Sequence, residues 1–379
     1  MRVLDGAQAS RMCVDGRDVL LFAGSNYLDL ATHPEVVDAA ARAARDFGCA
    51  AGGSRLITGN LAIHEALEDE LAAFFGTQAA LAFSTGYMAN AGVLPALVGP
   101  GDAIVSDALV HASLIDGARL SRAAIHVFAH GDADALEAVL RDVAPSHRRV
   151  LVVLDGVYSM DGDLAPLGRL VPIAKRHDAM VLLDDAHGAF ALGTNGRGAA
   201  ELFGVAGDVD VLVGTLGKGL GSFGAFVAGS AALRELLVNT ARSFIFSCAL
   251  APPQVEAARA ALRLVAREAW RRDRLAANAA RLRARLAEHG ISTAPSVTHI
   301  VPVVLGDNGT AMQTCERLLA RGFYAQGIRW PSVPEGTARL RITPMATHEL
   351  AEIDAFANAV VEEVAPCNRA YSSPAPIPA

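Results

Sequence analysis

Two short segments of the sequence bring an acid, an imidazole and an amine to positions where they could act together. The first, Met180 to Gly188, is an apolar run that ends in Asp184, a second aspartate and His187. The second, Val209 to Gly224, is an apolar run followed by a glycine-rich turn that contains Lys218. Short apolar runs closed by turn residues are typical of buried parallel strands, and ligands bind beyond the carboxyl ends of such strands. We therefore expect both segments to face one crevice.

A lysine between glycines leaves room for a planar ligand to approach its amine, which could form a Schiff base. Pyridoxal phosphate would use every polar group nearby. A carboxylate such as Asp184 would keep its ring nitrogen protonated, and His187 could donate a hydrogen bond to its phenolic oxygen. The N–H groups of a helix that follows Ser84-Thr85-Gly86-Tyr87 would bind its phosphate, and Thr215 would add a hydroxyl. The order of these groups along the chain favours a pyridoxal phosphate site.

Each candidate also has a purely structural interpretation. Asp184 could cap a turn, and Lys218 could be a solvated loop lysine. His111 could be an ordinary histidine at a helix start, which its spacing alone favours, and Ser159 could merely stabilise a turn. Taken together, the ordered phosphate loop, Asp-x-x-His and Thr-x-x-Lys outweigh these separate interpretations.

Three arginines near the C-terminus are further candidates. Arg329, Arg339 and Arg341 could be surface charges. Because side chains alternate along a strand, Arg339 and Arg341 are predicted to share one face. A bidentate clamp on a substrate carboxylate would favour arginine at such a position.

Other ligand motifs are disfavoured. A nucleotide P-loop fails because Leu212 holds the first glycine position and Gly219 follows the lysine. The run Gly219 to Gly224 satisfies Gly-x-Gly-x-x-Gly, but a predicted strand follows it where a dinucleotide motif needs a helix. No Gly-x-Ser-x-Gly hydrolase motif occurs, and His64 lacks the second histidine of a zinc helix. We therefore expect no metal site.

Length and composition indicate a two-domain protein that acts on small molecules. A chain of 379 residues exceeds the roughly 250 to 300 residues that one core supports. No apolar run reaches about 18 residues, so we expect no membrane span and no secretory signal. Five scattered cysteines fit reduced thiols in the cytoplasm. With 33 basic against 40 acidic residues and dispersed arginines, nucleic acid is a poor partner.

Alternating strand and helix patterns predict an α/β fold with a mainly parallel central sheet wrapped by helices. The predicted strands of this sheet are 79–83, 103–106, 125–128, 150–154, 180–183, 209–213 and 225–228. Before the first strand we predict a helix at 35–47, a flexible loop at 52–55 and a second helix, capped by Asn60, up to Gly76.

A smaller α+β domain is predicted after residue 240. Pro252-Pro253 begins one long predicted helix to His289, and strands follow at 299–305, 324–328 and 338–342. The predicted organisation begins with an N-terminal segment, 1–35, that joins the small domain, followed by the large α/β domain at 36–240. The small domain itself is predicted at 241–365, and a flexible proline-rich tail at 366–379.

Several ordered motifs make the sequence resemble the α-oxoamine synthases, a family of fold-type I pyridoxal phosphate enzymes. The resemblance runs from Phe22 to His348 and rests on Gly52-Gly-Ser-Arg, Phe83-Ser-Thr-Gly-Tyr, His111-Ala-Ser-Leu, Tyr158-Ser-Met-Asp-Gly-Asp, Asp184-Asp-Ala-His-Gly, Gly214-Thr-Leu-Gly-Lys and Gly336-Thr-Ala-Arg-Leu-Arg. It implies a decarboxylating condensation of an amino acid with an acyl thioester, carried by coenzyme A or an acyl carrier protein. It also implies a homodimer with the active site at the interface.

The resemblance implies a role for each matching residue near the cofactor. Lys218 would hold pyridoxal phosphate covalently and then remove the α-proton of the amino acid. His111 would stack on the cofactor ring, against the preference from spacing. Asp184 would pair with the ring nitrogen, and His187 and Ser159 would hold the phenolic oxygen.

The same resemblance implies the remaining contacts. Gly86, Tyr87 and Thr215 would bind the phosphate, helped by Ser247 from a second subunit. For the substrates, the implied residues are Arg341 or Arg329 at the carboxylate, Ser332 near the acyl chain and Asn26 in an active-site loop.

The substrate pair is predicted from a shorter stretch. Gly327 to Pro334 is most similar to the branch of the family that joins L-alanine to a pimeloyl thioester. Other branches use serine with palmitoyl-CoA, or glycine with acetyl- or succinyl-CoA. An aminotransferase and a cofactor-free relative of the same fold are the alternatives outside the family.

Three departures from the family pattern concern the substrate side. The chain begins late and lacks most of a segment that in relatives supplies a substrate-contacting arginine, a role that Arg2 could take. The loop from Ser25 to Leu30 is one residue shorter than usual. Trp330 and Ser332 replace the usual proline and threonine.

Overall fold

The structure, a computed structural model, describes residues 2–368, and the chain forms two compact units. The large unit comprises Leu30–Ser159 and Leu164–Arg272, and the described residues of the small unit are 2–29, Met160–Asp163 and 273–368. The chain therefore passes from one unit to the other after Asp29, Ser159, Asp163 and Arg272. The predicted domain boundaries at 35 and 240 stay a prediction. Of the predicted tail, 369–379 lies outside the described residues.

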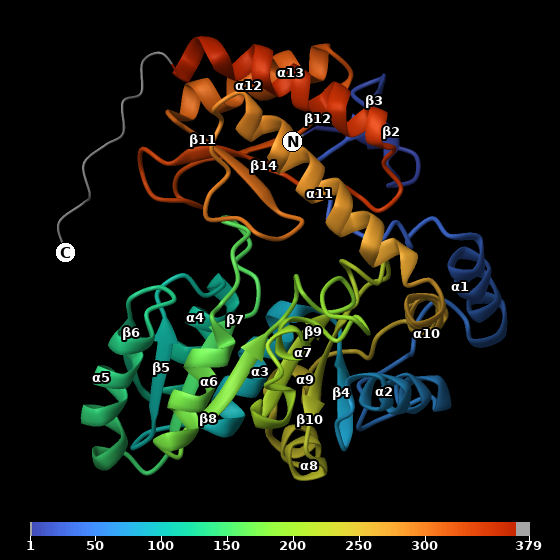
Figure 1. The fold of residues 1–379 in the computed structure, drawn as a ribbon. Coiled ribbons are helices and arrows are strands. Elements are labelled where there is room, and N and C mark those ends of the chain that lie inside the picture. The colour runs from blue at the N-terminus through green and yellow to red at the C-terminus, as the bar shows by residue number, and fades with distance from the viewer. Residues whose placement is uncertain (1, 369–379) are drawn as a thin grey trace. The chain divides into compact units, whose positions relative to one another are not determined.

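A seven-stranded sheet forms the centre of the large unit (Figure 1). Its strand order is β4 (Ala79–Phe83), β10 (Ala225–Gly229), β9 (Val211–Thr215), β8 (Met180–Asp184), β7 (Val150–Asp155), β5 (Ala103–Asp107) and β6 (Ala124–Phe128). The strands from β9 to β6 are parallel, and β10 runs antiparallel to both of its neighbours. All seven predicted strands are present, and the mainly parallel α/β fold is confirmed.

Helices pack around this sheet (Figure 1), and their buried side chains are mostly apolar. On α3, for example, Val93 and Leu94 are fully buried in one core cluster with Ile104 of β5 and Leu182 of β8. The helices of the large unit are α1 (Pro34–Phe47), α2 (Ala62–Phe75), α3 (Gly86–Leu97), α4 (Ala112–Ser121), α5 (Ala133–Val143), α6 (Leu167–Arg176), α7 (Ala199–Leu202), α8 (Ala231–Thr240), α9 (Arg242–Ile245) and α10 (Pro252–Arg267), with short 3₁₀ turns at Ala144–Ser146 and Ala206–Asp208.

The start of α2 differs from the prediction. Leu61, and not Asn60, is the N-cap residue. The Asn60 side chain instead accepts from Arg55 at 2.6 Å and donates to Glu65 at 2.8 Å. The loop at 52–55 was predicted to be flexible, but the Arg55 guanidinium is buried in a bidentate pair with Glu68, which fixes the loop.

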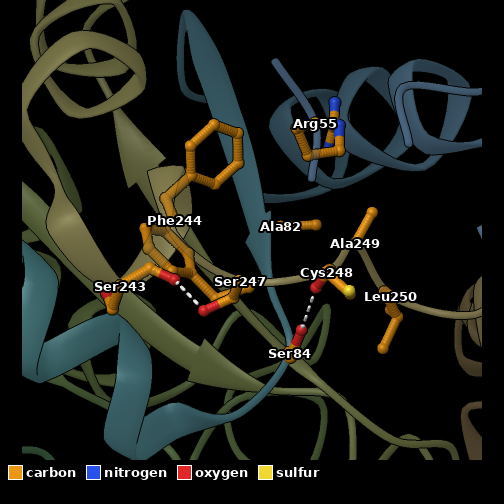
Figure 2. Close-up of a pocket in the computed structure, with 10 residues that line it drawn as sticks. Arg55, Ala82, Ser84, Ser243, Phe244, Ser247, Cys248, Ala249 and Leu250 are labelled. Carbon is orange, nitrogen blue, oxygen red and sulfur yellow. Dashed lines mark hydrogen bonds between the residues drawn. The ribbon is translucent and has the colours of Figure 1, made fainter. Parts of the chain in front are cut away.

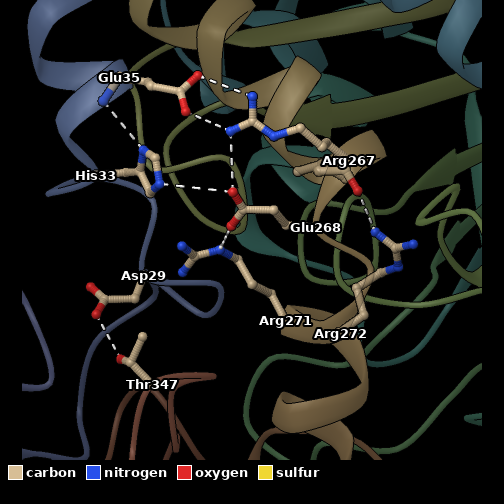
Figure 3. Close-up of polar contacts among 9 residues, drawn as sticks. Asp29, His33, Glu35, Arg267, Glu268, Arg271, Arg272 and Thr347 are labelled. Atoms are coloured by element: carbon tan, nitrogen blue, oxygen red, sulfur yellow. Dashed lines mark hydrogen bonds and ion pairs between the residues drawn. The ribbon is translucent and has the colours of Figure 1, made fainter.

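The helix predicted from Pro252 to His289 is two helices, α10 and α11 (Trp270–Glu288). Side chains form hydrogen bonds with backbone and charged groups at the break between the two helices (Figure 3). Glu268 accepts from Arg271 at 2.8 Å, and Arg272 donates to the Val265 carbonyl at 2.7 Å. The start of α1 joins this network through an ion pair of 2.5 Å between Glu35 and Arg267. No glycine or proline marks the break, so residue-by-residue helix signals could not predict it.

The small unit contains two small sheets. One has the order β1 (Leu4–Asp5), β2 (Arg11–Val14), β3 (Arg17–Leu21) and β12 (Phe323–Tyr324), and the other has the order β11 (Val301–Gly306), β14 (Ala338–Ile342) and β13 (Gln326–Ile328). The single strand predicted at 324–328 is therefore two strands in different sheets.

Helices complete the small unit. Besides most of α11, they are α12 (Asn308–Ala320) and α13 (Leu350–Asn368), which includes the first three residues of the predicted tail. Phe22 is fully buried, and its ring stacks on Phe356 with centroids 3.9 Å apart. Among the described residues, no helix is long and apolar enough to span a bilayer.

Candidate active site

Three parallel strands of the large unit end in polar residues at the same edge of the sheet. Asp155 is the last residue of β7, Asp184 the last of β8 and Thr215 the last of β9. The register pairs Asp155 with Asp184 directly, and Asp184 with Val213. The strand pairing thus brings carboxyl groups and a hydroxyl to the carboxyl end of the sheet, where ligands bind in α/β folds.

The glycine-rich turn after β9 presents Lys218 at this edge. The turn is closed by hydrogen bonds from Ser222 N–H to the Leu216 carbonyl at 2.8 Å and from Gly221 N–H to the Lys218 carbonyl at 3.0 Å. Gly221 has φ +69°, and a Cβ there would lie 2.4 Å from the Ala31 nitrogen, so only glycine fits. The turn is therefore a defined conformation and not a loose loop.

The Lys218 amine meets an imidazole. Lys218 Nζ lies 3.1 Å from His187 Nε2. His187 is buried and lies in the turn that follows β8, three residues after Asp184. The two segments singled out by their chemistry therefore converge on one point.

A cavity of about 270 Å³ lies at this point, within the large unit. Seven of the predicted residues line it: Gly86, Tyr87, His111, Asp184, His187, Thr215 and Lys218. The Thr215 hydroxyl donates to the Gly224 carbonyl at 3.1 Å and accepts from Gly217 N–H at 3.2 Å, so it also fixes the lysine turn. The cavity is a little below the size range typical of small-ligand pockets.

Asp184 is held by hydrogen bonds to both of its carboxylate oxygens. Oδ1 accepts from the Ala186 N–H at 3.0 Å, and Oδ2 accepts from the Asn90 amide at 2.7 Å. Asp185 does not line the cavity: it is fully buried behind it. Of the two neighbouring aspartates, Asp184 is thus the one that can reach a ligand.

The pKa values around Asp184 are shifted by burial and charge. Burial, followed by the negative charge of Asp184, raises the pKa of Asp155 well above its ordinary range. The pKa of His111 is lowered, mainly because surrounding protein atoms shield part of its ring from water. The positive charge of Lys218 adds to this lowering, and the negative charge of Asp184 opposes it. We therefore expect Asp155 to hold a proton and His111 to be neutral at pH 7.

The start of α3 offers backbone N–H groups to the cavity. Thr85 is its N-cap residue, and its hydroxyl accepts from Met88 N–H at 3.1 Å. A Cβ added at Gly86 would meet nothing within 4 Å, so space adjoins the first turn of the helix. A helix start with open space beside it is suited to a phosphate.

Ser247 lines a different crevice, in which Arg55, Ser84 and Phe244 also take part (Figure 2). Its hydroxyl donates to the Ser243 carbonyl at 2.6 Å, and the Ser84 hydroxyl donates to the Cys248 carbonyl at 3.1 Å. This crevice, of about 10 Å³, has room for roughly one water molecule. The chain does not bring Ser247 to its own cofactor cavity, and Ser159 does not line that cavity either.

The four predicted substrate-binding residues, Asn26, Arg329, Ser332 and Arg341, belong to the small unit. Arg341 lies on β14 and is buried, and the Asn26 amide donates to the Gln8 carbonyl at 2.9 Å. Their contacts with a substrate stay a prediction.

Two further arginines of the small unit are held in ion pairs. Arg339 pairs with Asp161, which occupies the guanidinium that was considered for a substrate clamp. Arg2 pairs with Asp15 at 2.6 Å and with Glu316.

Sequence reasoning did not find Asn90, Ser113 and Asp155, which also line the cavity. Asn90 could have been noticed because it lies four residues after Gly86 on α3, and residues four apart share a helix face. Ser113 lies two residues after His111 at the start of α4, and only the fold shows that it faces inward. No group of His, Cys, Asp or Glu among the described residues could hold a metal ion.

The cavity fits pyridoxal phosphate on the chemistry of its lining. A carboxylate, a lysine amine and a helix start surround one space, which matches a ring nitrogen, an aldehyde carbon and a phosphate. Which residues hold each part stays a prediction.

Comparisons with known proteins agree with this chemistry. The family model "Aminotransferase class I and II" matches residues 17–360. An 8-amino-7-oxononanoate synthase from Citrifermentans bemidjiense is 50% identical over 96% of this chain and 93% of its own length. One from Geobacter sulfurreducens is 51% identical over 93% of this chain and 91% of its own length.

Solved structures show the same fold. A serine palmitoyltransferase from S. paucimobilis with bound PLP has a TM-score of 0.94 at 35% identity, and the match covers 97% of this chain and 93% of that one. An 8-amino-7-oxononanoate synthase from Francisella tularensis has a TM-score of 0.79 at 25% identity, covering 92% and 98%.

The fold and the family match define the class of protein: a fold-type I transferase of the pyridoxal phosphate-dependent kind. Within that class, the chain belongs to the α-oxoamine synthase family, which confirms the resemblance seen in the sequence.

Proposed function

We propose that this enzyme condenses L-alanine with a pimeloyl thioester and releases CO₂, which gives 8-amino-7-oxononanoate, an intermediate of biotin biosynthesis. The observation that carries the proposal is the identity of 46–51% to eight 8-amino-7-oxononanoate synthases, each over at least 92% of this chain. The structural match to serine palmitoyltransferase is 35% identical, so that sister reaction is the second candidate.

Pyridoxal phosphate, when bound, supplies an electron sink for the α-carbon of the amino acid. In our proposal Lys218 Nζ is both the attachment point and the base that removes the α-proton. Asp184 faces the ring nitrogen, and the two hydrogen bonds that it accepts keep its carboxylate in one orientation. The first turn of α3 holds the phosphate.

The two histidines, His187 and His111, have separate roles in the proposal. His187 lies beside the Lys218 amine at 3.1 Å and is placed to donate to the phenolic oxygen, together with Ser159. His111 would cover one face of the ring. On the substrate side, Arg341 or Arg329 would bind a carboxylate, with Ser332 near the acyl chain and Asn26 in the substrate loop.

The proposal includes a homodimer in the cytoplasm. Ser247 lines a crevice apart from its own cofactor cavity, which suits a residue that serves the site of a second subunit. The neighbouring Phe246 is 69% exposed in the single chain, as expected for a side chain that a second copy would cover. Sedimentation analysis should give twice the chain mass, and Phe246→Asp should shift it toward the monomer.

Release of the thiol from the acyl thioester tests the reaction. The purified enzyme, loaded with pyridoxal phosphate, is given alanine, serine or glycine, each with pimeloyl-CoA, pimeloyl-acyl carrier protein, palmitoyl-CoA, acetyl-CoA or succinyl-CoA. We expect turnover with alanine and a pimeloyl thioester only. Turnover with serine and palmitoyl-CoA instead would replace the proposal by the sister reaction, and conversion of an oxo acid without any thioester would indicate an aminotransferase.

A further inference from the structure

Hydrogen bonds link Asp184 to His111 through two buried side chains that the proposed chemistry does not use. The Asn90 amide nitrogen lies 2.7 Å from Asp184 Oδ2 and 2.9 Å from Ser113 Oγ. Ser113 Oγ lies 2.7 Å from His111 Nδ1. Asn90 and Ser113 are each 1% exposed, so water does not compete for the bonds that join Asp184, Asn90 and Ser113, whereas the bond to His111 is partly buried.

Close packing of α3 against α4 sets the distance between the two linking residues. A Cβ at Gly117 of α4 would lie 2.8 Å from the Asn90 carbonyl oxygen, so only glycine allows the helices to approach this closely. Asn90 and Ser113 therefore meet through the backbone framework and not through a flexible loop.

The direction of each hydrogen bond follows from which atoms can donate. Asn90 must turn its nitrogen toward Asp184, because a carboxylate only accepts. The same nitrogen donates to Ser113 Oγ, and the hydroxyl hydrogen of Ser113 can then donate to His111 Nδ1. The backbone N–H of Ser113 also points at Nδ1, at 3.3 Å. A ring nitrogen that accepts from two donors carries no proton.

We propose that Asn90 and Ser113 are positioning residues that hold His111 as a neutral imidazole with its proton on Nε2, in one orientation relative to Asp184. The inference rests on the proposed function only for the roles that it gives to His111 and Asp184. The hydrogen bonds themselves are present in the chain whatever its function. A protonated Nδ1 would face the Ser113 N–H, and this repulsion disfavours the imidazolium.

The charged and titratable groups that face His111 come from three neighbouring elements. Asp155 of β7 accepts the backbone N–H of His111 at 3.4 Å. Asp184 of β8 favours the charged imidazole, and Lys218 after β9 disfavours it. Asp184 already accepts from Asn90 and from the Ala186 N–H, and these two hydrogen bonds limit how far its carboxylate can turn toward the imidazole.

Nitrogen NMR of the cofactor-free protein, labelled with ¹⁵N-histidine, tests the proposal without any turnover. His111→Gln assigns the signals of His111 by their loss. We expect the wild-type Nδ1 signal in the range of an unprotonated nitrogen and the Nε2 signal in that of a protonated one, from pH 8 down past the ordinary histidine value of about 6.5.

Ser113→Ala and Asn90→Leu test the link from either end. Ser113→Ala removes one donor to Nδ1, and Asn90→Leu frees the Ser113 hydroxyl to point elsewhere. Both should mix the two tautomers of His111 and move its titration to higher pH. Ser121→Ala is the matched control, because Ser121 is a buried serine on the same helix whose hydroxyl bonds only within its own turn.

A protonated Nδ1 in the wild type would overturn the proposal, as would a Ser113→Ala spectrum of His111 identical to that of Ser121→Ala. If Asn90→Leu does not fold, Ser113→Ala alone decides. Failure of the thioester assay with an intact NMR result would reject the proposed function and leave the role of Asn90 and Ser113 standing.

Discussion

Lys218 Nζ lies 3.1 Å from His187 Nε2, so the amine and the imidazole share a hydrogen bond at the wall of the cavity. An ammonium group can only donate. When Lys218 is protonated, His187 Nε2 must therefore accept, and a neutral His187 then carries its proton on Nδ1. This contact orders the lysine side chain at the position where the α-proton is removed in our proposal.

Lys218→Ala should abolish cofactor attachment and reduce thiol release by about 10³-fold or more, because one residue supplies both the attachment and the base. The chain contains two lysines, Lys175 and Lys218. Lys175 pairs with Asp210 at 2.5 Å and does not line the cavity, so Lys175→Ala is the matched control. After borohydride reduction, mass spectrometry should find the cofactor mass on Lys218. Its presence on Lys175 would contradict the assignment.

Asp184→Asn should reduce thiol release by about 10²- to 10³-fold, because a neutral amide cannot stabilise a protonated ring nitrogen, and removal of one preorganised electrostatic partner typically has this effect. The substituted amide also loses an acceptor for Asn90. Asp184→Glu keeps the charge and should retain part of the activity. Steady-state turnover of both variants checks this, and equal activity of the Asn and Glu variants would show that charge is not what Asp184 contributes.

The strands of the large sheet could be predicted because each is a short apolar run closed by turn residues. The same pattern placed Asp184 and Lys218 at neighbouring strand ends before any pairing was known. The pattern could not give the strand order, and in particular not that β10 inserts antiparallel between β4 and β9. Strand pairing is decided by packing between segments far apart in the sequence, and the residue pattern of a single strand contains no information about its neighbours.

The residues that support the site were harder to predict for a different reason. Asn90 and Ser113 have ordinary neighbours in the sequence, and their role depends on two helices that pack closely at Gly117. Asn60 was wrongly predicted for the opposite reason. Its residue type is typical of a helix cap, but its side-chain amide forms hydrogen bonds with Arg55 and Glu65 instead. Polar residues are therefore assigned reliably only when their tertiary partners are known.

Glu68→Gln should reduce the free energy of unfolding by about 3–5 kcal/mol, because it leaves the buried Arg55 guanidinium without its counter-charge. The pair is bidentate, at 2.6 and 3.1 Å, and its side chains are 6% and 3% exposed. Asp354→Asn is the matched control, since the Arg281–Asp354 pair is largely exposed and worth about 0–1 kcal/mol. Urea unfolding of both variants should show a large shift in midpoint for Glu68→Gln alone. Similar small shifts would contradict the prediction.

His299 of the small unit should make the protein sensitive to acid. Burial, then the positive charges of Arg341 and Arg283, lowers the pKa of His299 to about 3, and neither ring nitrogen has a hydrogen-bond partner. The unfolded chain therefore takes up the proton first as the pH falls. The contribution of His299 to stability is lost from about pH 6.5 downward, by up to about 1.4 kcal/mol per pH unit.

His299→Phe should flatten this loss, since it keeps a planar ring beside Tyr27, whose ring centroid lies 4.1 Å from that of His299, and takes up no proton. His289→Asn, at an exposed histidine, should leave the pH dependence as in the wild type. The midpoint of thermal unfolding, measured between about pH 7 and 4, checks both variants. Parallel curves for the wild type and His299→Phe would show that another group controls the acid sensitivity.

Asp185 lies behind the cavity and ties three segments of the large unit together. Its backbone N–H donates to the Val213 carbonyl at 2.8 Å, and its Oδ2 accepts from the Ala199 N–H at 2.7 Å. Oδ1 has no partner, and glycines crowd the carboxyl group: a Cβ at Gly198 would lie 1.8 Å from Oδ2. Burial is the main reason why the pKa of Asp185 is raised to about 7.

Because the folded-state pKa of Asp185 lies above the unfolded value of about 3.8, the folded protein holds this proton longer as the pH rises. The contribution of Asp185 to stability should therefore fall between about pH 4 and 7, by up to about 1.4 kcal/mol per pH unit, which is opposite in sign to the contribution of His299. Asp185→Asn carries no charge at any pH, so the variant should gain stability relative to the wild type over this range, whereas Asp142→Asn, at an exposed aspartate, should not. Thermal unfolding at several pH values measures the difference, and a difference that is independent of pH would mean that Asp185 does not ionise in this range.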